Sequence, residues 1–410
     1  MTATTTIIFL AVYSGMILGG LPFLQLDRTG VALLGAIALI TVDAVGLREA
    51  AESIHLPTLI LLFSFMVIAA QMRLGGFYDW VARKLASLPL APPLLLGATT
   101  FVIASLAAVF SNDVVCLAVA PVMIDTCRKR GLDPIPFLLA LACAANIGSA
   151  ATLIGNPQNM LIGQTLRLSF AGYFLVAAPP VIAGLLLTWA LIAWQSAGHW
   201  VLVDAERATG GADEPVRQEV PLNLWQTIKG LVVAATLLVA FLIGPWPREH
   251  VALTGAGVLL MSRRLHSSQM LGQVDWELLV LFMGLFVVNH ALQQTQFTAD
   301  LLAGLARSGL NLDQPGWLSA VTVVLSNLVS NVPAVMLLLP VAHHPGAGPL
   351  LALVSTLAGN LLIVGSIANI IVIDVAAKHG IRIGWWRHAR TGVPLALLTV
   401  AIAAAYVAAR

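Results

Sequence analysis

Two short polar sequences interrupt long apolar stretches of this chain. The first is SND at residues 111–113, and the second is SNV at residues 330–332. Serine and asparagine side chains can donate and accept hydrogen bonds, whereas an ionised aspartate only accepts them. Polar and ionisable groups are costly inside a membrane and tend to be functional there. The pattern predicts a binding site for a small polar solute or ion, built from Ser111, Asn112, Asp113, Ser330 and Asn331.

Two further polar breaks follow, one after each of these sequences. They are GNPQN at residues 155–159 and GSIAN at residues 365–369. Helices break inside a membrane only where the backbone is buried or lines a cavity, and the ends of half-helices carry partial charges. We expect all four breaks to meet near the middle of the membrane, which adds Asn156, Asn159, Ser366 and Asn369 to the site. The alternative is that such side chains only hold helices together, and this alternative stays open for single residues such as Asn146 and Asn360.

Asp113 is the carboxylate that the apolar pattern places deepest in the membrane. Removal from water favours the protonated form of a carboxyl group, whereas a nearby cation favours the ionised form. Asp113 could therefore exchange a proton for a sodium ion or another solute, and we expect it to be the proton-coupling residue. The alternative is a carboxylate that is satisfied by Asn or backbone donors. Val332 occupies the corresponding place in the second sequence, so only one of the two sequences carries a charge.

The composition is that of a polytopic membrane protein. Hydrophobic residues make up 59% of the chain and charged residues only 10%, whereas about a quarter of a soluble domain is charged. The net charge of +2 gives no reason to expect nucleic acid as a partner. Cys116, Cys127 and Cys143 form no CxxC or zinc pattern. The N-terminal segment lacks a basic region and a cleavage site, so we expect it to be a first span rather than a removed signal.

Long apolar segments fill most of the chain, and many are near the roughly 20 residues that span a bilayer. The one long polar stretch, residues 196–224, contains five acidic residues and a Gly-Gly pair, which is typical of a linker. The apolar segments lie at about 5–24, 30–47, 57–75, 93–126, 135–166, 171–195, 226–245, 250–264, 276–296, 316–345, 349–377 and 390–408.

The regions on either side of the linker resemble each other. VALLGA at residues 31–36 returns as VALTGA 220 residues later. The Ser-Asn pair returns after 219 residues, and GNPQN returns as GSIAN after 210. Internal repeats are typical of secondary transporters. We therefore expect a first repeat at 1–195, a cytoplasmic linker at 196–224 and a second repeat at 225–410.

The distribution of Lys and Arg indicates how the repeats are oriented. If segments 93–126 and 316–345 each enter and leave on one side, each repeat has five further spans, and the repeats are inverted. Under this arrangement 16 of the 21 Lys and Arg residues fall on one side, which the positive-inside rule makes cytoplasmic. Two short spans would fit the same count as well as a re-entrant hairpin does. We expect an all-α fold of about ten transmembrane helices in two inverted repeats, each with a re-entrant hairpin and a broken helix. We place it in a bacterial-type inner membrane, with both termini outside the cytoplasm.

Four segments carry a family resemblance: SNDVVCLAVAP, ANIGSAATLIGNPQNMLIG, SNVPAVMLLLP and STLAGNLLIVGSIANIIVID. They resemble signature segments of the ion transporter superfamily, closest to its arsenical pump and sodium/proton antiporter branch, with the arsenite–antimonite permeases and related bacterial anion permeases. The resemblance covers nearly the whole chain. It implies an elevator-type alternating-access motion of a transport domain against a scaffold, usually in a homodimer. Carried over by position, it implies that the solute site is lined by Ser111, Asn112, Asp113, Asn156, Asn159, Ser330, Asn331, Ser366 and Asn369.

The third residue of each Ser-Asn sequence departs from the dicarboxylate carriers of this superfamily, which resemble Ser-Asn-Thr at both places. Here these residues are Asp113 and Val332. A carboxylate that faces the site repels a carboxylate substrate but suits a cation or a neutral hydroxide such as arsenious acid. Proton-coupled efflux of arsenite or antimonite is therefore the first hypothesis, and sodium/proton antiport is the second. An anion or carboxylate permease of the same superfamily is a further alternative. Cys116 is not assigned as a ligand, because a thiolate would release trivalent arsenic slowly.

Other classes of protein fit the sequence less well. An intramembrane protease would need a Ser/His pair or two facing aspartates, and neither pattern occurs. A channel would use the same polar lining, and proton-coupled counterflow would distinguish it from a carrier. No P-loop of the form GxxxxGK[ST] occurs, so an ATP-driven carrier would need a separate ATPase subunit. We expect no enzymatic activity, cofactor or metal site. The expected partners are protons, the lipid bilayer and a small inorganic solute, either arsenite/antimonite or sodium.

Overall fold

The computed structural model describes residues 2–20, 24–201, 221–295, 304, 307, 309–342 and 344–410. Within these residues the chain is almost entirely helical, with no β-strand and one isolated bridge between Leu132 and Val201. The expected all-α, polytopic membrane fold is confirmed. Most of the expected linker, residues 202–220, lies outside the described residues.

The helices before the linker include long apolar spans and shorter elements. Among them α4, α6 and α10 are long and apolar enough to cross a membrane unaided. The bounds are α1 (Thr2–Leu18), α2 (Arg28–Thr41), α3 (Leu47–Ser53), α4 (Leu56–Leu74), α5 (Phe77–Ala86), α6 (Pro92–Phe110), α7 (Asn112–Lys129), α8 (Pro134–Ser149), α9 (Pro157–Thr165) and α10 (Phe170–Gln195).

The helices after the linker follow the same order of long and short elements. Here α12, α15 and α21 are long and apolar enough to cross a membrane. The bounds are α12 (Leu224–Ile243), α13 (Arg248–Leu260), α14 (Ser267–Leu271), α15 (Trp276–Gln293), α17 (Pro315–Val329), α18 (Asn331–Leu338), α19 (Ala347–Ala358), α20 (Ile367–Lys378) and α21 (Trp385–Ala408).

Two pairs of helices form hairpins whose tip is a single serine. Ser111 separates α6 from α7, and Ser330 separates α17 from α18. The open end of the first hairpin is closed by Arg130, which donates to the carbonyl oxygens of Leu88 and Leu90 at 3.1 and 2.9 Å. Because Arg130 follows α7 and the two leucines precede α6, both arms start from the same end of the molecule, as in a re-entrant hairpin.

The packing before the linker recurs after it with the partners exchanged. Helix α2 packs on α15, and α13 packs on α4. Other pairs recur without an exchange. Helix α6 packs on α8, and α17 packs on α19 in the corresponding place; α8 also packs on α10, and α19 packs on α21. Helices α2 and α13 begin at Arg28 and Arg248, the offset of 220 that the sequence repeat has. Two copies of one unit that face each other across a two-fold axis would produce this exchange of partners.

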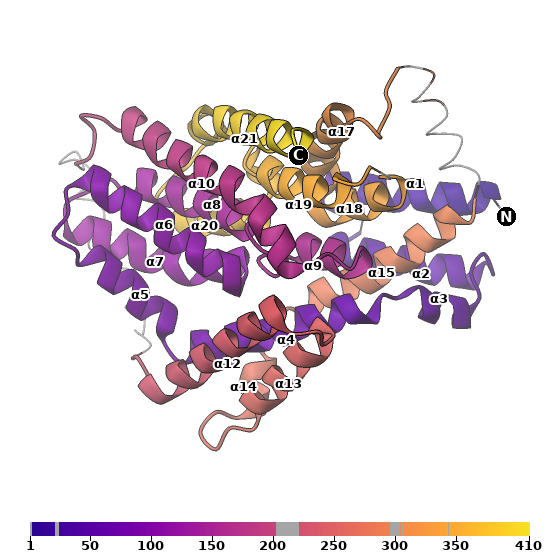
Figure 1. Ribbon diagram of the computed structural model, residues 1–410, viewed down its shortest axis with the longest axis horizontal. Coiled ribbons are helices and arrows are strands. Elements are labelled where there is room, and N and C mark those ends of the chain that lie inside the picture. Colours follow the sequence, from indigo (N-terminus) through magenta and orange to yellow (C-terminus); the bar gives the residue numbers. More distant parts are fainter. Residues whose placement is uncertain are drawn as a thin grey trace.

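The helices fall into two blocks (Figure 1). Helices α6–α10 and α17–α21 form the hairpin block, in which helices before the linker touch helices after it through α7 with α20 and α9 with α18. Helices α1–α4 and α12–α15 form the frame block, which meets the hairpin block through contacts such as α4 with α9 and α15 with α18. All but one residue of α8 and all but one of α19 are buried, so these two helices form the core of the hairpin block.

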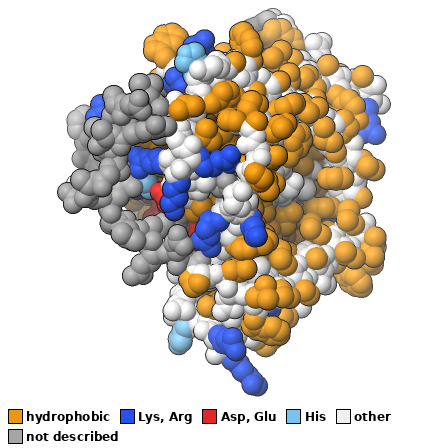
Figure 2. All heavy atoms as spheres, turned by 90° about the vertical axis from the view of Figure 1, so that its left-hand side faces the viewer, with side chains coloured by type: hydrophobic (Ala, Val, Ile, Leu, Met, Phe, Trp, Pro, Cys, Tyr) orange, Lys and Arg blue, Asp and Glu red, His pale blue; other side chains and the backbone are white. Residues whose placement is uncertain are grey.

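Lys and Arg side chains gather on one end of the molecule. Figure 2 shows this face, which lies at the left of Figure 1. Where α7 and α20 end, Arg128 donates to the carbonyl oxygen of His379. Arg387, at the start of α21, lies 3.7 Å from the carboxylate of Asp133. The ends of several helices therefore meet at a basic surface.

Candidate functional site

The two hairpin tips share an unusual backbone conformation. Ser111 has φ 70° and ψ 132°, and Ser330 has φ 78° and ψ 162°. Residues other than glycine rarely adopt a positive φ. Those that do cluster at functional sites, where the surrounding structure holds the strained backbone in place. This turn lets α7 and α18 start directly at Asn112 and Asn331. Each tip therefore presents an asparagine on the first residue of a helix.

Asn146 of α8 connects the first tip to the second broken helix. Its Oδ1 accepts hydrogen bonds from Asn112 Nδ2 at 3.0 Å and from Ser366 Oγ at 2.8 Å. Its Nδ2 donates to Asn360 Oδ1 at 2.8 Å and to Asn369 Oδ1 at 3.2 Å. All five side chains come from four separate segments. The structure thus brings three of the predicted residues together through Asn146, whose role the sequence left open.

The second tip borders the same network. Asn369 Nδ2 donates to the carbonyl oxygens of Gly359 and Leu362, at 2.8 and 3.1 Å. Gly359 packs beside Asn331, because a Cβ atom on this glycine would lie 3.4 Å from Asn331 Nδ2. The two tips therefore approach one cluster of amide and hydroxyl groups, Asn112 by a direct hydrogen bond and Asn331 by packing.

Asn156 and Asn159 use their side chains within the first broken helix. Asn156 Oδ1 accepts from the backbone N–H of Asn159 at 2.9 Å and caps α9. Asn156 Nδ2 donates to Ser149 Oγ at 3.0 Å and Thr356 Oγ1 at 3.2 Å. Asn159 Nδ2 donates to the hydroxyl of Tyr173 at 3.2 Å. These contacts brace α9 against α19 and α10, and direct contact of either asparagine with a solute stays a prediction.

Three oxygen atoms at the tips are buried without a hydrogen-bond partner among the described residues. They are Asn112 Oδ1, Asp113 Oδ1 and Asn331 Oδ1. More than nine in ten buried polar groups in proteins have a partner, so unpartnered oxygens at both tips agree with the prediction of a ligand there, which stays a prediction. All three atoms are acceptors. The arrangement suits a group that donates hydrogen bonds or a cation.

Asp113 lines a cavity of about 70 Å³ between the first hairpin tip and the frame block. Arg73 at the end of α4 and Asp275 at the start of α15 face the same cavity. Neither residue stands out in the sequence, because each lies at the polar end of an apolar segment, where charged residues are common. Their only signal in the sequence is a charge next to a span.

The depth of Asp113 in the membrane stays a prediction, because burial within the protein is a separate property. Asp113 as a whole residue is half-buried, whereas Asp79 of α5 is 6% exposed. Helix α5 packs on α7, and this contact covers an acid that the sequence places between two spans. Cys116 is buried one turn along α7 and does not line the cavity. In the described part of the chain, no three His, Cys, Asp or Glu residues lie together as a metal site would need.

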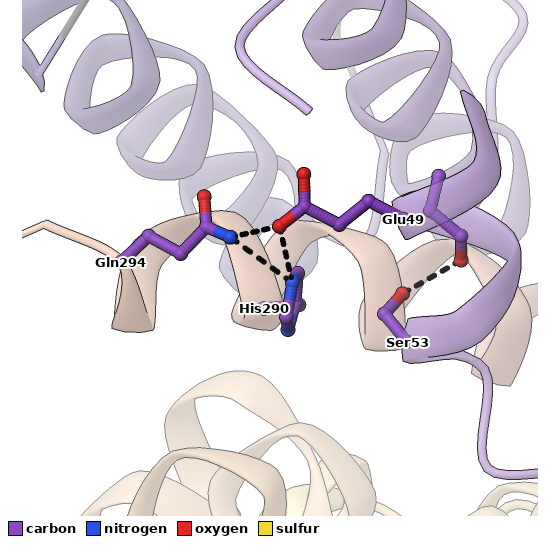
Figure 3. Close-up of polar contacts among 5 residues, drawn as sticks. Glu49, Ser53, His290 and Gln294 are labelled. Atoms are coloured by element: carbon purple, nitrogen blue, oxygen red, sulfur yellow. Dashed lines mark hydrogen bonds and ion pairs between the residues drawn. The ribbon is translucent and has the colours of Figure 1, made fainter. Parts of the chain in front are cut away.

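A separate polar contact joins α3 to the end of α15 (Figure 3). His290 Nε2 lies 3.1 Å from Glu49 Oε1, and Gln294 also donates to this oxygen. The hydrogen bond from His290 lowers the pKa of Glu49, and the bond from Gln294 adds to this effect. None of these residues lines the Asp113 cavity. Their arrangement is that of a structural contact between two helices of the frame block.

Residues 8–358 match the family described as citrate transporter. The chain belongs to the citrate transporter family. It is 30% identical to the silicon efflux transporter LSI3 of Oryza sativa subsp. japonica, over 93% of this chain and 92% of that protein. It is also 30% identical to a 46 kDa membrane protein of Mycobacterium leprae, over 93% of this chain and 94% of that protein. A putative transporter arsB of Dictyostelium discoideum is 23% identical, over 92% of this chain and 87% of that protein.

Family membership confirms the expected resemblance to the ion transporter superfamily. The chain is a multi-pass membrane transporter of small solutes or ions and not an enzyme. The family description names citrate and one relative's name gives silicon, so membership in the family leaves the choice of solute to the chemistry of the site.

Proposed function

We propose that this transporter exports a small neutral hydroxide, arsenite or antimonite, in exchange for protons. The observation that carries the proposal is the set of three unpartnered acceptor oxygens, on Asn112, Asp113 and Asn331. Arsenious and antimonous acid are neutral at pH 7 and present O–H groups, which donate to such oxygens. A citrate anion presents carboxylate oxygens instead, and Asp113 would repel them.

The names of two relatives support this class of solute. One is called a silicon efflux transporter and another a putative transporter arsB. Silicic acid is also a small neutral hydroxide, so the same acceptor oxygens would suit it. The word efflux in the first name supports the proposed direction of transport. Silicic acid therefore belongs in any test of arsenite.

The two blocks support an elevator-type mechanism. In this proposal the hairpin block carries the tips and the bound solute, and the frame block stays fixed in the membrane. The proposed repeats comprise residues 1–195 and 225–410, joined by a linker at 196–224. The exchanged packing partners of the two regions support this division. A proton on Asp113 and the solute would then occupy the site in turn, so that each conformational cycle moves one of them against the other.

The basic end of the molecule supports the proposed orientation. Lys and Arg gather on the face shown in Figure 2, and cytoplasmic loops carry an excess of these residues. We place this end in the cytoplasm of a bacterial-type cell, with the transporter in the inner membrane and both termini on the opposite side. A homodimer is the proposed assembly, and an ATPase subunit would act as a further partner only if proton exchange does not drive transport.

Sodium/proton antiport is the second candidate, because the same observation favours it. Carboxylate and amide oxygens are ligands for hard cations, and the three unpartnered oxygens include both kinds. A sodium ion would replace the proton on Asp113 directly. The two candidates use one site and differ only in what fills it.

Transport in liposomes tests the two candidates together. The purified protein is reconstituted, a pH gradient is imposed, and uptake of arsenite, silicic acid and sodium is measured in parallel. The proposal predicts uptake of arsenite that requires the gradient. Uptake of silicic acid alone would keep the class of solute and change its identity, whereas uptake of sodium alone would establish the second candidate. Flux of citrate without the other three would contradict both candidates.

A further inference from the structure

A second acidic residue faces the cavity that contains Asp113. Asp113 lines the cavity from the first turn of α7, and Asp275 lines it from the residue that precedes α15. Asp113 belongs to the hairpin block and Asp275 to the frame block, so the cavity joins an acidic residue from each block.

The two carboxylates differ in their access to water. Asp113 Oδ1 is buried and unpartnered, whereas Asp275 is an exposed residue. Arg73, which also lines the cavity, is exposed as well. The cavity therefore joins a buried carboxyl oxygen of Asp113 to an exposed carboxylate, that of Asp275. This is the arrangement that a proton needs in order to travel between a buried site and the solution.

The capping of α15 by Asp275 does not require a charged side chain. Asp275 Oδ1 accepts the backbone N–H of Leu278 at 2.9 Å and caps α15. Asparagine caps helices about as well as aspartate does, so the cap itself needs no charge. The carboxylate has a second oxygen, which is available for a proton.

We propose that Asp275 receives the proton that Asp113 releases and passes it to the solution. The proposal rests on the proton exchange at Asp113 proposed above. In this step the O–H bond of the Asp113 carboxyl group breaks, and its proton moves through water in the cavity to a carboxylate oxygen of Asp275. Asp113 is left ionised, and Asp275 then gives the proton to bulk water. Motion of the hairpin block would separate the two carboxylates and end the transfer.

The other charged and titratable groups around this path are few among the described residues. Arg73 faces the cavity from α4. Cys116 lies one turn along α7, and Cys143 lies on α8; both thiols are buried. The α9 side contributes Pro157 and other residues that do not titrate. Asp275 is therefore the carboxylate that can take a proton from Asp113 at the mouth of the cavity.

Two substitutions separate the charge of Asp275 from its cap. Asp275→Asn keeps a good capping residue and removes the charge, whereas Asp275→Glu keeps the charge on a residue that is a poorer cap. Glu277→Gln is the matched control, because Glu277 is an exposed acid on the same turn of α15 and does not line the cavity.

The first readout needs no solute. The purified protein is treated with a carbodiimide, which reacts with protonated carboxyl groups in apolar surroundings, and labelling of Asp113 is followed by mass spectrometry as a function of pH. We expect the midpoint of labelling to move to lower pH in Asp275→Asn, because loss of a neighbouring negative charge makes a carboxyl group easier to ionise. The midpoint should stay unchanged in Glu277→Gln and nearly unchanged in Asp275→Glu.

The second readout is transport in liposomes with arsenite as the probe. Loss of a positioned proton carrier should slow proton-driven uptake on the order of 10²-fold in Asp275→Asn, while solute counterflow, which needs no net proton release, continues. Asp275→Glu should retain most of the uptake. Equal labelling midpoints in Asp275→Asn and the unaltered protein would overturn the proposal, whatever the solute is. A loss of uptake in Asp275→Glu together with normal uptake in Asp275→Asn would also overturn it, because this pattern would point to the cap instead of the charge.

Discussion

The first and second hairpin tips have the same backbone turn but differ in the side chain that follows the asparagine. Ser111 and Ser330 have φ values of 70° and 78°, and an asparagine follows each of them. The next residue is Asp113 on the first tip and Val332 on the second. Val332 is only 8% exposed and packs in the core, whereas Asp113 faces a cavity. The shared backbone therefore presents an asparagine at both tips, whereas a charged side chain is present on one tip alone.

Removing the charge from the first tip should have the largest effect. We predict that Asp113→Asn abolishes proton-driven transport, a loss of more than about 10²-fold, because an amide cannot carry the proton. The protein should still fold, since Asn is close to Asp in size and shape. Proton-driven uptake in liposomes measures the effect, and gel filtration in detergent checks the fold.

The matched control for this variant is Asp125→Asn on the same helix. Asp125 is a half-buried acid farther along α7 that does not line the cavity. We expect it to leave transport unchanged. Normal uptake with normal pH dependence in Asp113→Asn would remove this residue from the mechanism and erase the difference between the tips.

Removing either asparagine should have the next largest effect. We predict that Asn112→Ala and Asn331→Ala each weaken arsenite binding, by roughly 1–3 kcal/mol for the loss of one hydrogen bond to the solute. Asn112→Ala should also lower the melting temperature, because Asn146 Oδ1 then loses one of its two donors. Equilibrium binding to the purified protein and thermal unfolding in detergent give the two measurements.

The two asparagine variants sharpen the comparison between the tips. Similar losses of binding would mean that both tips hold the solute. A loss in Asn112→Ala alone would restrict the site to the first tip, and normal binding by both variants would contradict the paired site.

The shared turn predicts a smaller and symmetric effect on stability. Positive φ strains a residue other than glycine by roughly 1–3 kcal/mol. We predict that Ser111→Gly and Ser330→Gly both preserve or raise the melting temperature, whereas Ser111→Val and Ser330→Val both lower it. Opposite responses at the two serines would show that the tips do not share one conformation in the folded protein.

The Glu49–His290 contact should respond weakly to acid. Its hydrogen bonds lower the pKa of Glu49 in the folded protein, so their stabilising effect is present above the usual carboxyl pKa of about 4.3 and is lost as the pH falls through the lowered value. We predict lower hydrogen-exchange protection in α3 below about pH 4, measured relative to the intrinsic exchange rate at each pH, while protection at the hairpin tips changes independently. A His290→Asn variant, which lacks the ring, should lose this pH dependence, and an unchanged profile would contradict the assignment.

Local sequence was enough to place the breaks and the tips. Segments such as 93–126 carry an apolar run with one polar interruption, and the structure turns the chain there, at Ser111. Lipid allows such an interruption only where the backbone is buried or faces a cavity, which is why a short polar sequence is informative. The offset of 220 residues was also readable, because α2 and α13 begin at matching arginines.

Contacts between distant segments could not be read in this way. Asn146 joins Asn112 and Ser366, which are 254 residues apart in the sequence numbering, and nothing near Asn146 in sequence distinguishes a ligand from a residue that holds helices together. Asp275 looks like an ordinary helix cap until packing brings it to the cavity of Asp113. Burial of Asp79 likewise depends on where α5 packs. These features arise from tertiary packing, which a local pattern does not specify.

Proton release on solute binding tests the central claim most directly. The purified protein is mixed with arsenite in weakly buffered detergent solution, and an indicator dye reports the protons released. If the solute and a proton compete for the first tip, binding should release a proton in the unaltered protein, because a bound donor or cation favours the ionised carboxylate. Release should vanish in Asp113→Asn and persist in Asp125→Asn. Arsenite binding without proton release, or equal release in Asp113→Asn, would contradict the assignment of the coupling charge to one tip.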